Sequence, residues 1–108
     1  MPTEHSSKQY ELDLEGIRSR VLQMGGMVET AILEAAKALD TRDEDLAEKV
    51  RQGDKAIDAL EERINDEAAR LIALRAPAAS DLRTVLAVLK IVASLERIGD
   101  YAKNMAKR

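Results

Sequence analysis

Paired carboxylates are the side chains of this sequence best suited to chemistry. Asp54 and Asp58 are four residues apart, as are Glu96 and Asp100. Residues at i and i+4 lie on the same face of a helix, so each pair would present its carboxylates side by side. Four carboxylates offer only oxygen ligands, which suit hard or borderline cations such as Mg²⁺, Mn²⁺ or iron. We therefore predict a metal site at Asp54, Asp58, Glu96 and Asp100.

The composition excludes several other kinds of site. The chain of 108 residues has no cysteine and a single histidine, His5, which excludes disulfides, thiolate sites, thiol catalysis and sites built from several imidazoles. Only Tyr10 and Tyr101 are aromatic, and 17 basic residues stand against 20 acidic ones. Without a basic surface or an aromatic stacking platform, we expect no nucleic acid partner. We also expect no organic cofactor.

No segment of the sequence is typical of export or membrane insertion. The opening MPTEHSSKQ lacks the apolar run of a signal peptide, and charges such as Lys90 interrupt the longest apolar stretches. We expect a cytoplasmic protein that does not insert into a membrane.

Two breaks divide the chain into three segments of helix-forming composition. Thr41 and Glu44 have the spacing of a capping box at the start of a helix. Pro77 cannot continue a helix, and Ser80 or Asp81 is suited to cap the next one. Short connections favour antiparallel neighbours, so we predict an all-α fold, an antiparallel up-down-up three-helix bundle. The predicted parts are a flexible tail over residues 1–7 and one domain over residues 8–108, with helices over about 8–40, 42–75 and 80–107.

The third segment differs from the first two because apolar residues follow two of its sides. The two stripes are Leu82, Val85, Leu86, Leu89 and Ala93, and Val88, Ile91, Leu95, Ile98 and Ala102. A helix that is apolar on two sides is buried from two sides, and three helices can cover only one of them. We interpret the other side as a surface for a partner; the alternative is a helix wedged centrally in a small bundle.

The turns predict which residues lie at the same level of the bundle. Asp58 lies 19 residues before Pro77, and Glu96 lies 19 residues after it. In an antiparallel pair of helices the two acid pairs would therefore meet. The same count about the first turn brings Gly25 and Gly26 to this level, where helix-weakening glycines suggest a close approach of backbone or ligand.

Four segments carry a family resemblance. They are VLQMGGMVE at Val21–Glu29, GDK at Gly53–Lys55, PAASDLR at Pro77–Arg83 and LERIGD at Leu95–Asp100. In this order, over almost the whole chain, they resemble the PhoU family of phosphate-transport accessory proteins. The resemblance implies two repeated three-helix bundles, each with an E/D-x-x-x-D motif pair that can hold a multinuclear metal cluster. The motifs carry over as Asp54/Asp58 and Glu96/Asp100, with Glu61, Glu62 and Asn104 as further candidates.

The resemblance implies a regulatory adaptor and not an enzyme. Such proteins negatively regulate phosphate uptake and the phosphate-starvation response on the cytoplasmic side of the membrane, between the ATPase of the phosphate ABC transporter and a sensor histidine kinase. Two departures stand out: Ala76 replaces the usual Gln before the proline, and family members are about twice as long. We therefore expect the first repeat only, half of a six-helix architecture, in which either a second repeat or a homo-oligomer such as a homodimer covers the third helix.

Two other functions remain open from the residues themselves. One is a carboxylate-bridged metalloenzyme of bundle architecture, which needs open coordination positions at the metal; the absence of histidine near the acids counts against it. The other is a metal-free helical oligomerisation module, in which the acids line a solvated groove.

Overall fold

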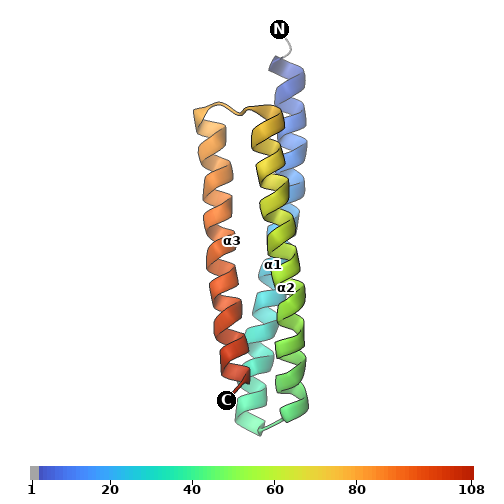
Figure 1. Cartoon of the computed structure of the whole chain (residues 1–108), viewed down its shortest axis with the longest axis vertical. Coiled ribbons are helices and arrows are strands. Elements are labelled where there is room, and N and C mark those ends of the chain that lie inside the picture. Colours follow the sequence, from blue (N-terminus) through green and yellow to red (C-terminus); the bar gives the residue numbers. More distant parts are fainter. Residues whose placement is uncertain (1–2) are drawn as a thin grey trace.

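Three long helices make up most of the described chain. The computed structural model describes residues 3–108, with side chains from Lys8 onward, and contains no strand in this range. Helices α1 (Thr3–Thr41), α2 (Glu44–Arg75) and α3 (Ala79–Ala106) each run antiparallel to the one before, in a rod 62 Å long and 17 Å wide (Figure 1). The predicted all-α three-helix fold is confirmed. Helix α1 begins before the predicted start at residue 8, and residues 1–2 of the predicted tail lie outside the described residues.

The turn between α1 and α2 corrects the predicted capping box. Thr41 is still the last residue of α1, and its hydroxyl donates to the carbonyl oxygen of Lys37 at 2.8 Å. The cap of α2 is Asp43, whose Oδ1 accepts the backbone N–H of Leu46 at 3.0 Å. The capping box was wrong because the first helix continues through Thr41, so its hydroxyl bonds within that helix.

The turn between α2 and α3 is held by backbone geometry. Ala76 adopts the left-handed conformation, with φ 42°, and its N–H donates to the carbonyl oxygen of Ile72. The residue before α3 is Ala78, which has no side-chain cap. The predicted caps Ser80 and Asp81 were wrong because α3 begins at Ala79 and already contains them. Asp81 instead places a negative charge in the first turn, where the helix dipole favours it.

The core is a seam of mainly aliphatic side chains in two clusters, the smaller one formed by Ala35, Val50, Ala102 and Ala106. In α3 the seam draws on both predicted stripes, because Val85 comes from one and Val88 from the other, while Leu86, Ile91 and Ile98 are exposed. The predicted division into two stripes was therefore wrong, although α3 does expose apolar residues. The fully buried side chains are Ile17, Met24, Ile64, Leu71, Val85 and Val92.

Contacts between the parallel helices α1 and α3 fix their register. The Tyr10 hydroxyl donates to the carbonyl oxygen of Asp81 at 2.9 Å. Lower in the bundle, a Cβ on Gly99 would lie 3.7 Å from Cγ2 of Val28, an ordinary contact. The predicted close approach of a backbone at Gly25 and Gly26 was wrong, because a Cβ on either would meet no atom of another element within 4 Å; the predicted approach of a ligand there stays a prediction. Both contacts join residues 71 apart, so the two helices keep one register along their length.

Candidate metal centre

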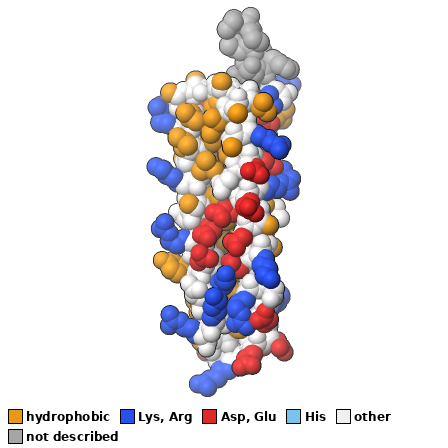
Figure 2. All heavy atoms as spheres, viewed as in Figure 1, with side chains coloured by type: hydrophobic (Ala, Val, Ile, Leu, Met, Phe, Trp, Pro, Cys, Tyr) orange, Lys and Arg blue, Asp and Glu red, His pale blue; other side chains and the backbone are white. Residues whose placement is uncertain are grey.

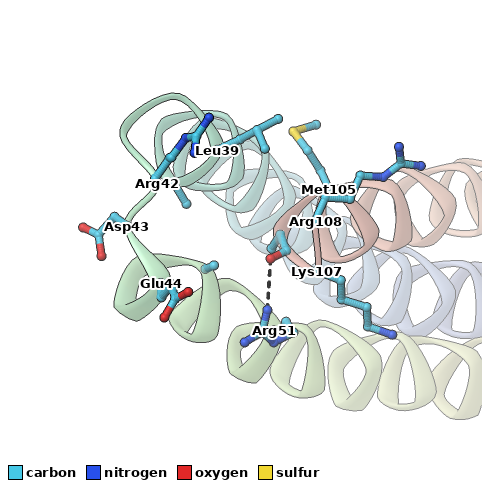
Figure 3. Close-up of a pocket in the computed structure, with 11 residues that line it drawn as sticks. Leu39, Arg42, Asp43, Glu44, Arg51, Met105, Lys107 and Arg108 are labelled. Atoms are coloured by element: carbon cyan, nitrogen blue, oxygen red, sulfur yellow. Dashed lines mark hydrogen bonds between the residues drawn. The ribbon is translucent and has the colours of Figure 1, made fainter.

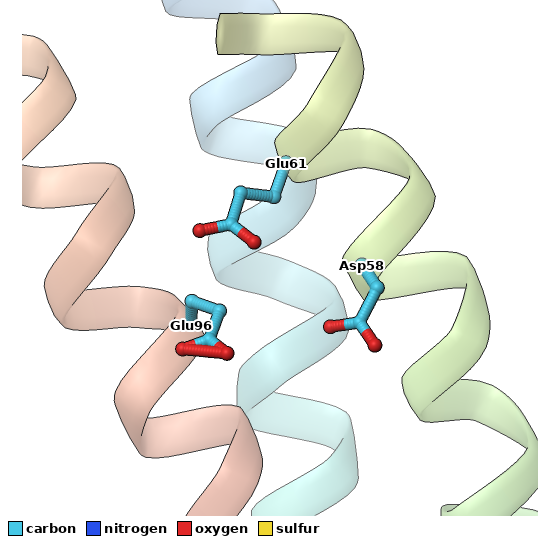
Figure 4. A group of neighbouring side chains, drawn as sticks. All are labelled: Asp58, Glu61 and Glu96. Carbon is cyan, nitrogen blue, oxygen red and sulfur yellow. The ribbon is translucent and has the colours of Figure 1, made fainter.

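Three carboxylates meet halfway along the bundle, where α2 and α3 face each other. Asp58 and Glu61 come from α2 and Glu96 from α3, and one oxygen of each lies within 4.8 Å of the others (Figure 4). Acidic side chains gather there on the surface (Figure 2). We call Asp58, Glu61 and Glu96 the carboxylate trio. The prediction that Asp58 and Glu96 lie at the same level along the bundle is confirmed, because both belong to the trio.

Asp100 stands beside the trio. It is half-buried one turn beyond Glu96 on α3. Its charge acts on all three members. Asp100 therefore belongs to the same negatively charged site.

Burial first, and neighbouring like charges second, raise the pKa values of all three trio carboxylates. Burial raises the pKa of Asp58, repulsion from Asp54 and Asp100 raises it further, and the charge of Lys103 acts in the opposite direction. Burial, then Asp58 and Asp100, raises the pKa of Glu61. Burial, then Asp100, raises the pKa of Glu96. Repulsion of this kind disfavours the ionised forms, and a bound cation would relieve it.

Asp54 lies in a different environment from its predicted partners. It is 4% exposed, and its Oδ2 lies 3.5 Å from the Nζ of Lys103. A lysine therefore compensates the charge of Asp54 inside the bundle. The remaining predicted candidates, Glu62 and Asn104, are exposed and outside the trio, although the charge of Glu62 does act on Asp58 and Glu61.

The donor set fits a hard cation. Within the part of the chain that the structure describes, none of the three trio carboxylates forms an ion pair with a basic side chain. All ligand atoms are oxygens, contributed by two helices, which matches the preference of Mg²⁺, Mn²⁺ and iron ions. The sequence could have indicated Glu61 as a main ligand, because Asp58 and Glu61 are spaced i, i+3, and such residues also share a helix face.

Comparison with known proteins identifies the family. The model of the PhoU domain matches residues 21–108. The chain belongs to the PhoU family. It is 45% identical over 106 residues to the phosphate-specific transport system accessory protein PhoU homolog of Pseudomonas aeruginosa. It is likewise 45% identical over 103 residues to PhoU of Escherichia coli.

The fold agrees with a solved PhoU structure. The crystal structure of PhoU from Pseudomonas aeruginosa matches with a TM-score of 0.87 and 44% identity, over 91% of this chain and 47% of that one. The match to the Pseudomonas homolog spans 98% of this chain but only 44% of the homolog. The match to the Escherichia coli protein spans 95% of this chain and 43% of that protein. This PhoU domain therefore spans a little under half the length of these relatives.

A cavity lies apart from the trio, at the end of the PhoU domain where α3 stops. It has a volume of 780 Å³ and lies between the turn joining α1 to α2 and the end of α3 (Figure 3). Four basic residues line it, and one of them, Arg51, donates to the carbonyl oxygen of Ala106 at 3.0 Å. No trio residue lines this cavity. Among the described helices, none combines the length and hydropathy needed to cross a membrane.

Proposed function

We propose that this PhoU domain is a regulatory adaptor of phosphate homeostasis. It acts in the cytoplasm, where it negatively regulates phosphate uptake and the phosphate-starvation response by contacting the ATPase of the phosphate ABC transporter and a sensor histidine kinase. The observation that carries the proposal is the 45% identity, over 98% of the chain, to a protein named as an accessory of phosphate-specific transport. An accessory role favours regulation through protein contacts over catalysis.

We further propose that the carboxylate trio, with Asp100, binds metal. The supporting observations are the convergence of three carboxylates from α2 and α3 and the absence of a basic ion-pair partner for them in the described region. Iron, Mn²⁺ or Mg²⁺ fits the donors, and Asp100 provides for a second ion in a multinuclear cluster. A bound cation supplies positive charge, and the trio would then join α2 to α3 through ligands from both helices.

Metal content tests the binding site directly. The chain is purified without chelator and analysed for metals beside Asp58→Asn and Glu96→Gln. Asp66→Asn is the matched control, because Asp66 is an exposed acid of the same helix outside the trio. We expect metal in the wild type and the control, and a loss of about tenfold or more in the other two variants, because each loses a charged ligand. Equal and negligible metal in all four samples would contradict the site.

Binding to the transporter tests the adaptor role separately. The purified chain is immobilised and exposed to the transporter ATPase and to the cytoplasmic part of the sensor kinase, with and without Mn²⁺. We expect saturable binding to at least one of them. A folded chain that binds neither protein, in either condition, would contradict the adaptor role while leaving the metal site to its own test.

A further inference from the structure

Lys103 is a positively charged residue beside the carboxylate trio. Its Nζ lies 3.5 Å from Oδ2 of Asp54, and Asp54 precedes Asp58 by one helical turn on α2. On α3, Lys103 follows Asp100 by three residues and Glu96 by seven, so it lies on the same side of the helix as both. Basic side chains are visible next to the acidic patch on this face of the bundle (Figure 2). The ammonium group therefore belongs to the surroundings of the trio.

The charge of Lys103 acts on the trio itself. Burial, Asp54 and Asp100 raise the pKa of Asp58, whereas Lys103 lowers it. A positive charge that attracts an ionised carboxylate repels any cation bound to that carboxylate, because both carry the same sign. Lys103 and a metal ion would therefore compete for the same negative charge.

The separation is short enough for this competition to matter. One turn of helix, the distance along α2 from Asp54 to Asp58, is about 5.4 Å. Salt at 0.1 M screens charges only beyond about 10 Å. The ammonium at Asp54 is therefore felt at Asp58 under ordinary solution conditions.

Asp54 holds Lys103 in this place. The side chain of Asp54 is 6% exposed and that of Lys103 is 36% exposed. If the ammonium group turned away into solvent, a buried carboxylate would lose its partner, which is costly. The pair is therefore neutral as a unit, and the negative charge of Asp54 is withheld from the neighbouring site.

We propose that Lys103 sets the affinity and the charge preference of the metal site. By neutralising Asp54, its ammonium group prevents that carboxylate from adding to the attraction on a bound cation. It disfavours trivalent ions more than divalent ones, because electrostatic repulsion is proportional to the charge of the ion. The inference rests on the metal site proposed above. A site weakened in this way releases its metal at a higher free concentration and can therefore respond to changes in metal supply.

Calorimetric titration with Mn²⁺ tests the effect on affinity. Lys103→Met should bind Mn²⁺ about three- to tenfold more tightly than the wild type, as expected for the removal of one partly screened charge. Lys103→Arg keeps the charge and should bind like the wild type. A purely structural lysine would give the opposite sign, because a less stable fold binds metal more weakly.

Lys90→Met is the matched control for the loss of one positive charge. Lys90 is an exposed lysine of the same helix, without an ion pair among the described residues. At 100° per residue it lies about a third of a turn around α3 from Glu96. Its replacement should change Mn²⁺ affinity less than about twofold, because its charge is exposed and screened.

A double variant separates charge from folding and from direct metal binding by Asp54. Asp54→Asn leaves Lys103 uncompensated and should weaken Mn²⁺ binding by about the factor that Lys103→Met gains. Asp54→Asn with Lys103→Met should bind like the wild type, because both charges are gone. This chain contains no buried unpaired charge at the site, and circular dichroism checks that every variant is folded. If Asp54 were itself a metal ligand, the double variant would stay as weak as Asp54→Asn, which would overturn the proposal.

The trivalent ion Tb³⁺ tests the charge preference in the same titration. The gain of Lys103→Met should be larger for Tb³⁺ than for Mn²⁺, with the logarithms of the two factors in a ratio of about three to two. Equal gains for the two ions would overturn an electrostatic role. A wild type that binds neither ion overturns the metal site together with this inference. A wild type that binds Mn²⁺, beside a Lys103→Met that binds it no more tightly, overturns this inference alone.

Discussion

Lys103 of α3 reaches across the bundle to Asp54 of α2, with its Nζ 3.5 Å from Oδ2. Asp54 is the one buried charged side chain among the described residues. A buried carboxylate is stable only when it is paired, and this pair ties α2 to α3 one turn from the carboxylate trio. Asp54 and Asp58, which look equivalent in the sequence, therefore lie in different surroundings: Asp54 is buried and paired with Lys103, whereas Asp58 forms no ion pair among the described residues.

Replacing Lys103 with Met should destabilise the fold. The substitution keeps an aliphatic side chain but leaves Asp54 buried without its partner, so we expect a loss of about 1–3 kcal/mol. Urea unfolding measures this loss of stability, and EDTA in the buffer removes any contribution from bound metal. Adding Asp54→Asn should recover most of the loss. Lys55→Met, at an exposed lysine of α2 without an ion pair in the described structure, is the control and should change the stability little. Equal stability of both single variants would contradict a structural role for the pair.

Metal affinity should depend on Glu61 more than on Asp54. Glu61 is part of the trio, whereas Asp54 is already paired with Lys103. We therefore expect Glu61→Gln to weaken Mn²⁺ binding about tenfold or more, which is roughly 1.4 kcal/mol or more, and Asp54→Asn to weaken it less. Calorimetric titration measures both, with Glu62→Gln as an exposed neighbouring control. If Asp54→Asn has the larger effect, the i, i+4 motif describes the ligands better than the trio does.

These differences show how much of the site the sequence can predict. The apolar periodicity and the breaks predict three helices and their approximate bounds. The equal sequence distances of Asp58 and Glu96 from the Pro77 turn predict that these two residues meet. The choice between Asp54 and Glu61 does not, because it depends on how far α2 is rotated against α3. That rotation depends on core packing and on contacts such as that of Lys103 with Asp54. These contacts join residues far apart in the sequence, so the local sequence pattern does not predict them. The same holds for α3, where Val85 and Val88 from two predicted stripes share one buried seam.

The stability of the metal-free chain should fall as pH rises through the raised pKa values of the trio. The pKa values of Asp58, Glu61 and Glu96 lie above their ordinary values, so the folded state holds these protons more tightly than the unfolded state. The stabilisation by protons is therefore complete below the ordinary carboxyl pKa and is lost above the raised one.

Glu96→Gln isolates this contribution. In EDTA the variant should gain stability relative to the wild type between pH 4 and pH 7, by less than about 1 kcal/mol because the site is partly exposed to solvent. With saturating Mn²⁺ at pH 7 the wild type should be more stable than Glu96→Gln, because the metal stabilises the folded state that binds it. Chemical unfolding at both pH values measures the effect. If the stabilities of the two chains run parallel at all pH values, the pKa of Glu96 is not raised in the folded chain.

Glycine at position 76 should stabilise the domain. Ala76 ends α2 with φ 42° and ψ 59°, a left-handed conformation in which a Cβ atom crowds the backbone at a cost of about 1 kcal/mol. Ala76→Gly removes the Cβ, and part of the gain is offset by the greater freedom of glycine in the unfolded chain, so we expect a net gain of about 0.5–1 kcal/mol. Ala78→Gly is the control, because Ala78 has φ −65° and gains nothing from losing its Cβ. Thermal unfolding should therefore rank Ala76→Gly above the wild type and Ala78→Gly below it, and the reverse order would show that the helix end carries no such strain.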